Sequence, residues 1–160
     1  MIDIAKKYFW YLSTSKSKID YLVGDGRLSL EREQPNQFHM LSVDAFSSDS
    51  IPMHLMTVEA LRGYKKQIRE DGAIVYNVTN RLINLAPMVK LIADKEGMES
   101  VLIANRPSED DLYRTDFVVV TNNKKLIASL QKAQDYKPIE TLPKLKAWTD
   151  SYNNLFDVLR

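Results

Sequence analysis

Three aspartates stand at or shortly after the ends of apolar runs, and these carboxylates are the side chains best suited to chemistry. Asp25 follows the run 19–23, Asp44 follows the run 38–43, and Asp49 lies a few residues further on. In open α/β sheets, ligands bind beyond the carboxyl ends of the strands. Carboxylates gathered there would favour a cationic substrate and could accept its proton. Asp and Gly are equally ordinary as turn and helix-capping residues after a strand, so this second interpretation stays open.

The elements that must position these aspartates alternate along the chain between strands and helices. Apolar runs predict strands at 19–23, 37–43, 73–78, 99–104 and 116–121. Helical periodicity predicts helices near 4–12, 27–33, 58–68, 85–96 and 124–133. Asp71 and Gly72 are expected to end the third of these helices, and Asn84 to cap the fourth. The alternation implies an α/β fold with a mainly parallel sheet.

Composition narrows the classes of function. The chain has 160 residues, of which 44% are hydrophobic and 27% charged, as in one ordinary globular domain. It has no cysteine and only two, widely separated, histidines, so we expect no metal site. A net charge of +1 gives no field to collect nucleic acid, and no apolar run is long enough to span a bilayer. These features predict a cytoplasmic protein with no nucleic-acid or membrane partner.

Three further groups of residues allow a functional and a structural interpretation. Glu109–Asp111 could bind a cation, but they lack the regular spacing of a calcium loop and fit a solvated loop better. Trp148 and Tyr152 could line an aromatic pocket, although aromatic residues near a chain end more often pin the tail to the core. His54 could act as an acid or base, yet without an identified partner it fits an exposed loop residue.

Four sequence motifs, two of which contain the aspartates, are longer or more specific than the single carboxylates. They are Val-Gly-Asp-Gly-Arg-Leu-Ser-Leu-Glu at 23–31, Val-Asp-Ala-Phe-Ser-Ser-Asp-Ser-Ile-Pro at 43–52, Asn-Arg at 80–81 and Trp-Thr-Asp-Ser-Tyr-Asn-Asn-Leu at 148–155. In this order they resemble the spermidine synthase-like family, the polyamine aminopropyltransferases, and most closely its branch that is often fused to membrane segments. The resemblance implies a three-layer, Rossmann-like fold of the S-adenosylmethionine methyltransferase type.

The resemblance also implies an activity and roles for single residues. The family transfers an aminopropyl group from decarboxylated S-adenosylmethionine, a co-substrate rather than a tightly bound cofactor, to a diamine such as putrescine. Asp44 matches the catalytic aspartate, and Asp49 matches a substrate-binding one. Asp25, between Gly24 and Gly26, matches the cofactor-binding residue that contacts the adenine. An alkyl amine titrates near about 10, so a carboxylate that takes its proton suits this chemistry.

The chain departs from the family pattern in two ways. In the family, the first two strands and the glycine-rich turn between strand and helix precede the helix that is expected here from Ile4, and no glycine precedes Gly24, so we expect these elements to be missing from this chain. The loop after Asp44 is longer by Ala45 and Phe46. We therefore expect residues 1–160 to form one partial domain, truncated by its first two strands, with the tail 136–160 docking on the core.

These departures leave two functional hypotheses. One is an aminopropyltransferase that uses a small polyamine and a nucleoside co-substrate. The other is a catalytically inactive remnant or an interaction module completed by a partner chain. Without the missing strands, the strand 38–43 would expose unpaired N–H and C=O groups along one edge. The strand 19–23 could close onto that edge, or another chain could cover it, and we expect a homodimer.

Overall fold

The computed structural model describes residues 2–44, 52–106 and 114–159. The chain divides into two compact units, Met1–Arg32 and Glu33–Arg160, and each is described by itself. Among the described residues no helix is both long and apolar enough to cross a membrane.

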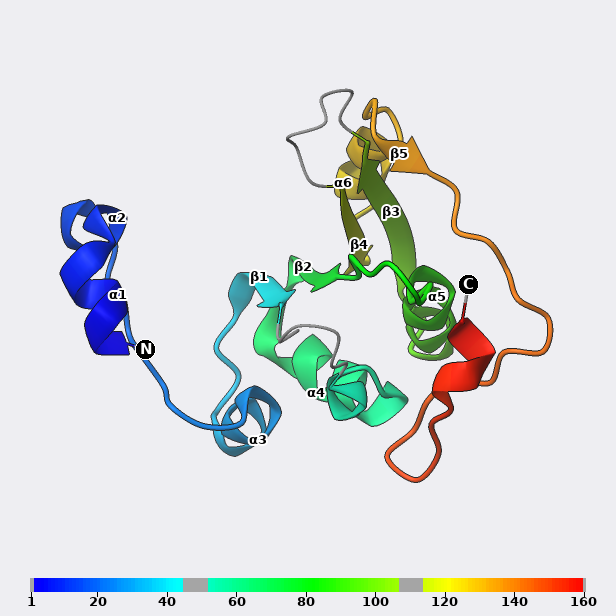
Figure 1. Ribbon diagram of the computed structural model, residues 1–160, viewed down its shortest axis with the longest axis horizontal. Helices are drawn as coiled ribbons and strands as arrows, with labels where there is room; N and C mark the ends of the chain where they lie inside the picture. The colour runs from blue at the N-terminus through cyan, green and yellow to red at the C-terminus, as the bar shows by residue number, and fades with distance from the viewer. Residues whose placement is uncertain (1, 45–51, 107–113, 160) are drawn as a thin grey trace. The chain divides into compact units, whose positions relative to one another are not determined.

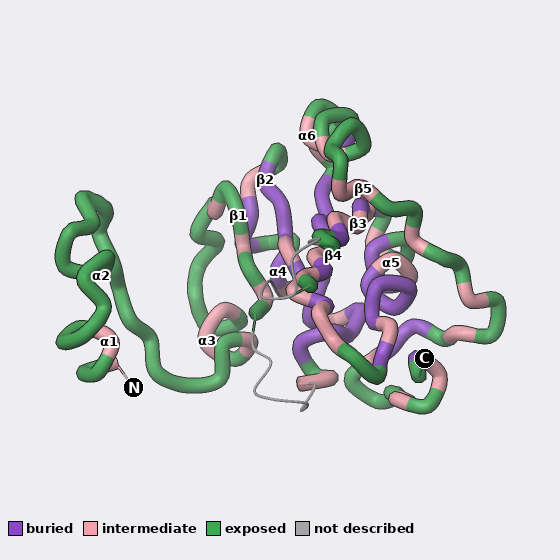
Figure 2. Tube along the Cα trace, turned by 45° about the horizontal axis from the view of Figure 1, so that its top comes forward, coloured by how far each residue is buried: buried purple, intermediate pink, exposed green. Residues whose placement is uncertain are grey.

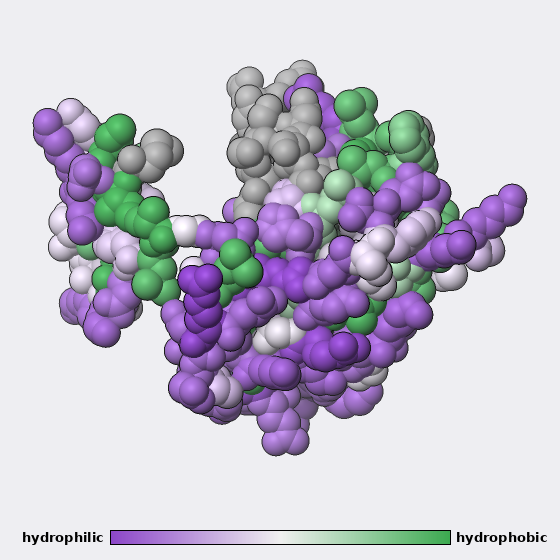
Figure 3. All heavy atoms as spheres, turned by 90° about the horizontal axis from the view of Figure 1, so that it is seen from below, coloured by the Kyte–Doolittle hydropathy of each residue, from purple (hydrophilic) through white to green (hydrophobic). Residues whose placement is uncertain are grey.

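The first unit consists of short helices that bury no side chain. They are α1 (Ile2–Tyr8), α2 (Trp10–Thr14) and α3 (Gly26–Arg32), which are labelled in Figure 1. Apolar side chains lie on the surface of this unit, as the green spheres of Figure 3 show. The predicted strand at 19–23 is wrong, because these residues are exposed and form no ladder. An apolar run becomes a strand only when a neighbouring strand satisfies its backbone groups.

The second unit is built on a sheet of five strands in the order β1-β2-β4-β3-β5. Along the chain these strands are β1 (Phe38–Val43), β2 (Ile68–Asn77), β3 (Glu99–Asn105), β4 (Thr115–Thr121) and β5 (Tyr136–Lys137). The α/β class is confirmed. The sheet is mixed rather than mainly parallel, because β1 pairs with β2 in parallel whereas the other neighbours are antiparallel. Apolar runs predict where strands lie but not their direction.

Strand β2 begins earlier than the sequence pattern predicts. Phe38 pairs with Ile68 but Met40 pairs with Ala73, so the register shifts at an irregularity that contains Asp71 and Gly72. A Cβ on Gly72 would lie 2.9 Å from the carbonyl oxygen of Phe38, which explains why glycine occupies this position. The prediction that Asp71 and Gly72 end the preceding helix is therefore wrong.

Two amphipathic helices contact each other and pack against the sheet. They are α4 (Val58–Gln67), which contacts β1 and β2, and α5 (Ala86–Lys95), which contacts β3 and β4. The Thr57 hydroxyl caps α4 by accepting from the Ala60 N–H at 3.1 Å. Leu85, rather than Asn84, occupies the N-cap position of α5 and provides no side-chain cap, so that prediction is wrong.

The remaining helices are shorter. Helix α6 (Lys124–Leu130) follows β4 and is capped by the side chain of Asn123. The 3-10 turn η1 (Met53–Leu55) precedes α4. A second 3-10 turn, η2 (Leu155–Val158), lies near the end of the chain. Buried segments, purple in Figure 2, concentrate in β2, β4, α4 and α5. The largest fully buried side chains include Trp148, Tyr76, Met56, Leu61, Ile74, Met88 and Ile92.

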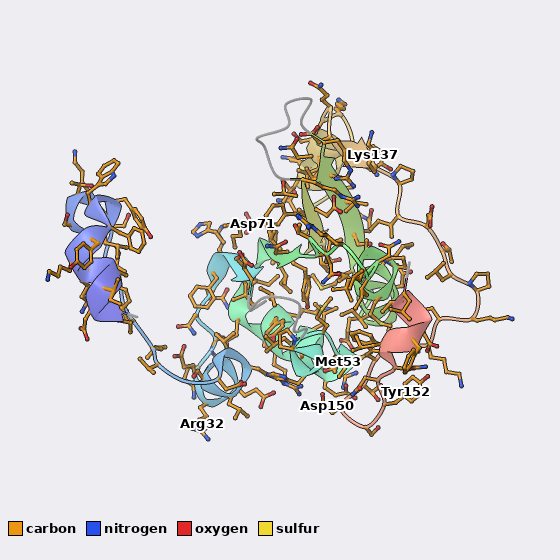
Figure 4. The ribbon with its side chains drawn as sticks, viewed as in Figure 1. Arg32, Met53, Asp71, Lys137, Asp150 and Tyr152 are labelled. Carbon is orange, nitrogen blue, oxygen red and sulfur yellow. The ribbon has the colours of Figure 1, made fainter. Side chains whose placement is uncertain are left out.

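The end of the chain is attached to α4 and to the segment before α5. The Trp148 carbonyl accepts from the Val58 N–H at 2.9 Å, and the Val158 carbonyl accepts from the Asn84 N–H at 2.8 Å. Thr57 donates its hydroxyl to the Asp150 carboxylate at 2.8 Å. In Figure 4, Asp150 and Tyr152 are labelled near the start of α4. Much of the Trp-Thr-Asp motif therefore has a structural role, which is to attach the end of the chain to α4.

Candidate functional site

The parallel pairing of β1 and β2 brings their carboxyl ends to one edge of the sheet. Val43 pairs with Tyr76, so Asp44 and Asn77 follow side by side. The Asn77 amide donates to a carboxylate oxygen of Asp44 at 3.0 Å, and Asp44 is exposed to solvent. A solvent-accessible carboxylate held at this edge is geometrically able to take a proton from a bound amine. The catalytic role of Asp44 stays a prediction.

Hydrogen bonds continue from Asn77 to the start of β4. The Asn77 side-chain oxygen accepts from the Thr79 N–H at 3.0 Å, and the Thr79 hydroxyl accepts from the Asp116 N–H at 2.9 Å. The Asp116 carbonyl accepts from the Val78 N–H at 2.8 Å. This chain of contacts fixes Asp44 relative to Asp116 along the same edge of the sheet.

Asp116 is a buried carboxylate that binds two arginines. Arg114 donates through Nη2 at 2.8 Å and through Nε at 3.2 Å, and Arg106 binds the other carboxylate oxygen. Burial alone would raise the pKa of the Asp116 carboxyl. The hydrogen bonds and charges of Arg106 and Arg114 outweigh that effect and hold this pKa below its usual value.

A pocket of about 220 Å³ adjoins this cluster at the carboxyl end of β3. Segments 137–140 and the start of α5 complete its wall. It combines charged and apolar side chains, which are Val78, Asn84, Ala86, Pro87, Leu102, Ala104, Arg106, Arg114, Asp116, Lys137, Pro138, Ile139 and Glu140. Sequence reasoning missed this pocket and the cluster of Asp116 with its arginines. The available signal was an acidic residue at the start of an otherwise apolar strand, with arginines at both ends of the preceding loop.

Asp25 caps helix α3 within the first unit. One of its carboxylate oxygens accepts from the Leu28 N–H at 2.9 Å, and its carbonyl accepts from the Ser29 N–H and hydroxyl. Gly24 has φ = 149°, a conformation that favours glycine, and Gly26 is the first residue of the helix. The capping interpretation of Asp25 is thus confirmed, and nucleoside binding by these residues stays a prediction.

The three predicted site aspartates do not fall within one described region. Asp25 belongs to the first unit and Asp44 to the second, whereas Asp49 lies outside the described residues. Glu109–Asp111 also lie outside them. The gathering of the three aspartates at one site therefore stays a prediction.

The structure also describes the surroundings of Trp148, Tyr152 and His54, the other candidate residues from the sequence. Trp148 is fully buried, and its backbone N–H faces the sulfur of Met88 at 3.4 Å. This geometry confirms that Trp148 pins the tail to the core. Tyr152 is 39% exposed, with the Lys146 ammonium 5.9 Å from its ring centre. His54 is exposed in η1.

Comparisons with known solved structures define the fold of the chain. No protein-family model matches the chain. A spermidine synthase from Thermotoga maritima covers 88% of this chain at 13% identity with a TM-score of 0.54. A probable spermidine synthase from Corynebacterium glutamicum covers 86% at 17% identity with a TM-score of 0.55. These likenesses confirm a Rossmann-like fold of the type found in spermidine synthases.

A sequence match covers about half of the chain. The polyamine aminopropyltransferase of Vibrio vulnificus is 30% identical over 77 residues, which are 47% of this chain. Over these residues the chain is similar in sequence to a polyamine aminopropyltransferase. It spans 25% of that relative, and 50% and 54% of the two solved structures. The similarity to the membrane-fused branch stays a prediction.

Proposed function

We propose that the chain contributes the amine-activating part of an aminopropyltransferase, with Asp44 as the proton acceptor. The supporting observation is the exposed Asp44 carboxylate, held by Asn77 at the carboxyl edge of β1 and β2. The sequence match to a polyamine aminopropyltransferase agrees with this role. The acceptor belongs to the class of diamines, and the donor is decarboxylated S-adenosylmethionine.

The proposed reaction is a nucleophilic displacement. Asp44 removes a proton from the acceptor ammonium, and the free amine attacks the aminopropyl carbon next to the sulfonium. A C–N bond forms while the C–S bond breaks, and its electron pair leaves with sulfur as methylthioadenosine. Asp49 would hold the acceptor, and Asp25 with Gly24 and Gly26 would bind the nucleoside. The proton on Asp44 passes to solvent.

A second candidate function is an inactive module that another polypeptide completes. Within the described sheet, β1 is an edge strand, and Met40 on it is 63% exposed. An unpaired apolar edge is a template for association with another strand. A second copy of the chain is the partner we propose, and light scattering at micromolar concentration tests it. A monomer at that concentration would exclude the homodimer.

Measurement of methylthioadenosine release tests the transferase. Asp44→Asn should lower kcat roughly 100-fold or more, because it removes a proton acceptor at nearly constant size. Asp71→Asn is the matched control, since Asp71 lies on β2 near its amino end and should leave turnover unchanged. Unaltered turnover in Asp44→Asn would refute the role of Asp44. No release by the chain, together with no heat of methylthioadenosine binding, would favour the inactive module.

A further inference from the structure

We propose that the pocket beside Arg106, Arg114 and Lys137 binds the carboxylate of a small organic ligand, and that the amine acceptor carries this carboxylate. The second half of this proposal rests on the proposed function. The first half concerns the pocket alone and can be tested without turnover.

The arginines carry more positive charge than Asp116 neutralises. Both guanidinium groups bind this one carboxylate, whose side chain is 5% exposed. The side chains of Arg106 and Arg114 remain 42% and 44% exposed. Arg106 forms its hydrogen bonds through Nη1, and Arg114 forms its hydrogen bonds through Nε and Nη2. Within residues 2–44, 52–106 and 114–159, the other nitrogens of these guanidinium groups have no hydrogen-bond acceptor. A planar fork of N–H donors suits a second carboxylate.

Two further features favour an anion in the pocket. Lys137 lines it from β5, where Figure 4 labels this residue, and its ammonium has no bond to another residue in the described part of the chain. Ala86 and Pro87 line it from the first turn of α5, whose N-cap provides no side-chain acceptor. The positive end of the helix dipole therefore adds to the side-chain charges. Glu140 is the other acidic residue in the described lining.

The rest of the lining limits the kind of ligand. Val78, Leu102, Ala104 and Ile139 give the pocket apolar walls. Its volume of about 220 Å³ is below the roughly 300 Å³ at which pockets for drug-sized molecules begin. A short aliphatic chain that ends in a carboxylate matches both the walls and the charges. A bare diamine would place its second ammonium against Arg106, Arg114 and Lys137.

The pocket and Asp44 share one edge of the sheet. Hydrogen bonds run from Asp44 through Asn77 and Thr79 to Asp116, which lines the pocket. An acceptor with its carboxylate at the arginines can therefore extend its amine along this edge toward Asp44. The substrate class that follows is a diamino acid rather than a simple diamine.

Calorimetry on the whole chain with L-ornithine and putrescine tests this inference, because the two molecules differ by one carboxylate. L-ornithine should bind roughly tenfold more tightly than putrescine. Lys137→Gln and Arg114→Gln should each reduce that advantage to about threefold or less. Lys132→Gln removes the same charge from an exposed lysine outside the pocket and should leave the ratio unchanged. Lys137→Gln keeps the test valid if Arg114→Gln disturbs the fold by weakening the pairing of Asp116.

Glutarate, an anion without an amine, separates this proposal from the proposed transferase. Glutarate binding that shifts the arginine Nε resonances supports the pocket even when no methylthioadenosine is released. Equal affinity for L-ornithine and putrescine, or insensitivity to both pocket variants, overturns the proposal even if putrescine is turned over.

A further control concerns the carboxylates that lie between the two arginines in the sequence, which are Glu109, Asp110 and Asp111. Binding of glutarate only after all three are changed to alanine would overturn the proposal as well.

Discussion

The two units contain similar residues but bury them very differently. Residues 33–160 enclose a core in which Trp148, Leu61 and Met88 are fully buried. Residues 2–32 contain several aromatic and aliphatic side chains, yet none is buried, and Trp10 is 74% exposed. Hydrophobic composition alone therefore does not make a core. A helix buries its apolar side only when another element of the fold presents a complementary surface.

The largest expected contrast concerns the two tryptophans. Trp148→Ala should lower the free energy of unfolding by about 3–5 kcal/mol, because it empties a fully buried site between the tail and α5. Trp10→Ala removes the same side chain from an exposed position and should change that free energy by less than about 0.5 kcal/mol. Urea denaturation followed by circular dichroism measures both. Similar losses in the two variants would show that the first unit also contributes to the cooperative core.

The next contrast concerns two ion pairs. Asp116→Asn should cost about 1.5–3 kcal/mol, because it weakens hydrogen bonds from two arginines to a buried carboxylate. Asp20→Asn, which breaks a pair with Lys18 whose side chains are 85% and 70% exposed, should leave the unfolding midpoint unchanged.

The pH dependence of the free energy of unfolding tests whether the charge of Asp116 causes the stability loss in Asp116→Asn. Its pKa in the folded protein is lowered from the ordinary value of 3.8, so the carboxylate stabilises the fold above that pH. The stabilisation should be lost as the pH falls below about 4 toward the folded pKa. Urea titrations across this range should bring the wild type and Asp116→Asn closer together. A constant difference would assign the effect of the substitution to packing.

A third contrast compares two helix caps. Thr57→Ala should destabilise the protein by about 1–2 kcal/mol, because the hydroxyl caps α4 and also binds Asp150 in the tail. Asp25→Ala removes a cap of the same kind from α3, which buries no side chain. It should leave the urea midpoint of the core unchanged. A shift of that midpoint would indicate that α3 unfolds together with the sheet.

The smallest contrast uses glycine to alanine changes in helices. Gly63 lies inside α4 with no heavy atom within 4 Å of a Cβ placed there. Gly63→Ala should raise the free energy of unfolding by about 0.5–1 kcal/mol through helix propensity. Gly26→Ala, in the equally open start of α3, should leave thermal unfolding of the core unchanged. Destabilisation by Gly63→Ala would contradict the open space seen around it.

The sequence predicted the parts of the fold whose local pattern has one dominant interpretation. Apolar runs predict strands at 37–43, 99–104 and 116–121, and the structure has strands at Phe38–Val43, Glu99–Asn105 and Thr115–Thr121. Direction and pairing depend on distant partners, so the antiparallel position of β4 between β2 and β3 did not follow from the pattern. The run 19–23 failed for the same reason, since apolar residues without a neighbouring strand do not form a ladder.

The candidate site was predicted only in part. The position of Asp44 at the carboxyl edge follows from strand order along the chain, because residues after parallel strands meet at one edge. The sequence pattern does not indicate Asp116 as a site residue, because Asp116 lies at the start of an antiparallel strand. The end of β4 that meets the carboxyl ends of β2 and β3 is its amino end. Arg106 and Arg114 can both bind Asp116 only because β3 and β4 pair in antiparallel directions.

This reversal also has a consequence for the order of folding. Strands β3 and β4 are joined by residues 106–114 and pair from Glu99–Thr121 to Asn105–Thr115, so their contacts are local in sequence. The pairing of β1 with β2 requires closure of a longer segment that includes α4. Local pairings tend to form before distant ones. In stopped-flow experiments, Val101→Ala on β3 should therefore slow refolding, whereas Leu41→Ala on β1 should mainly accelerate unfolding. The opposite assignment would mean that the parallel pair nucleates the sheet.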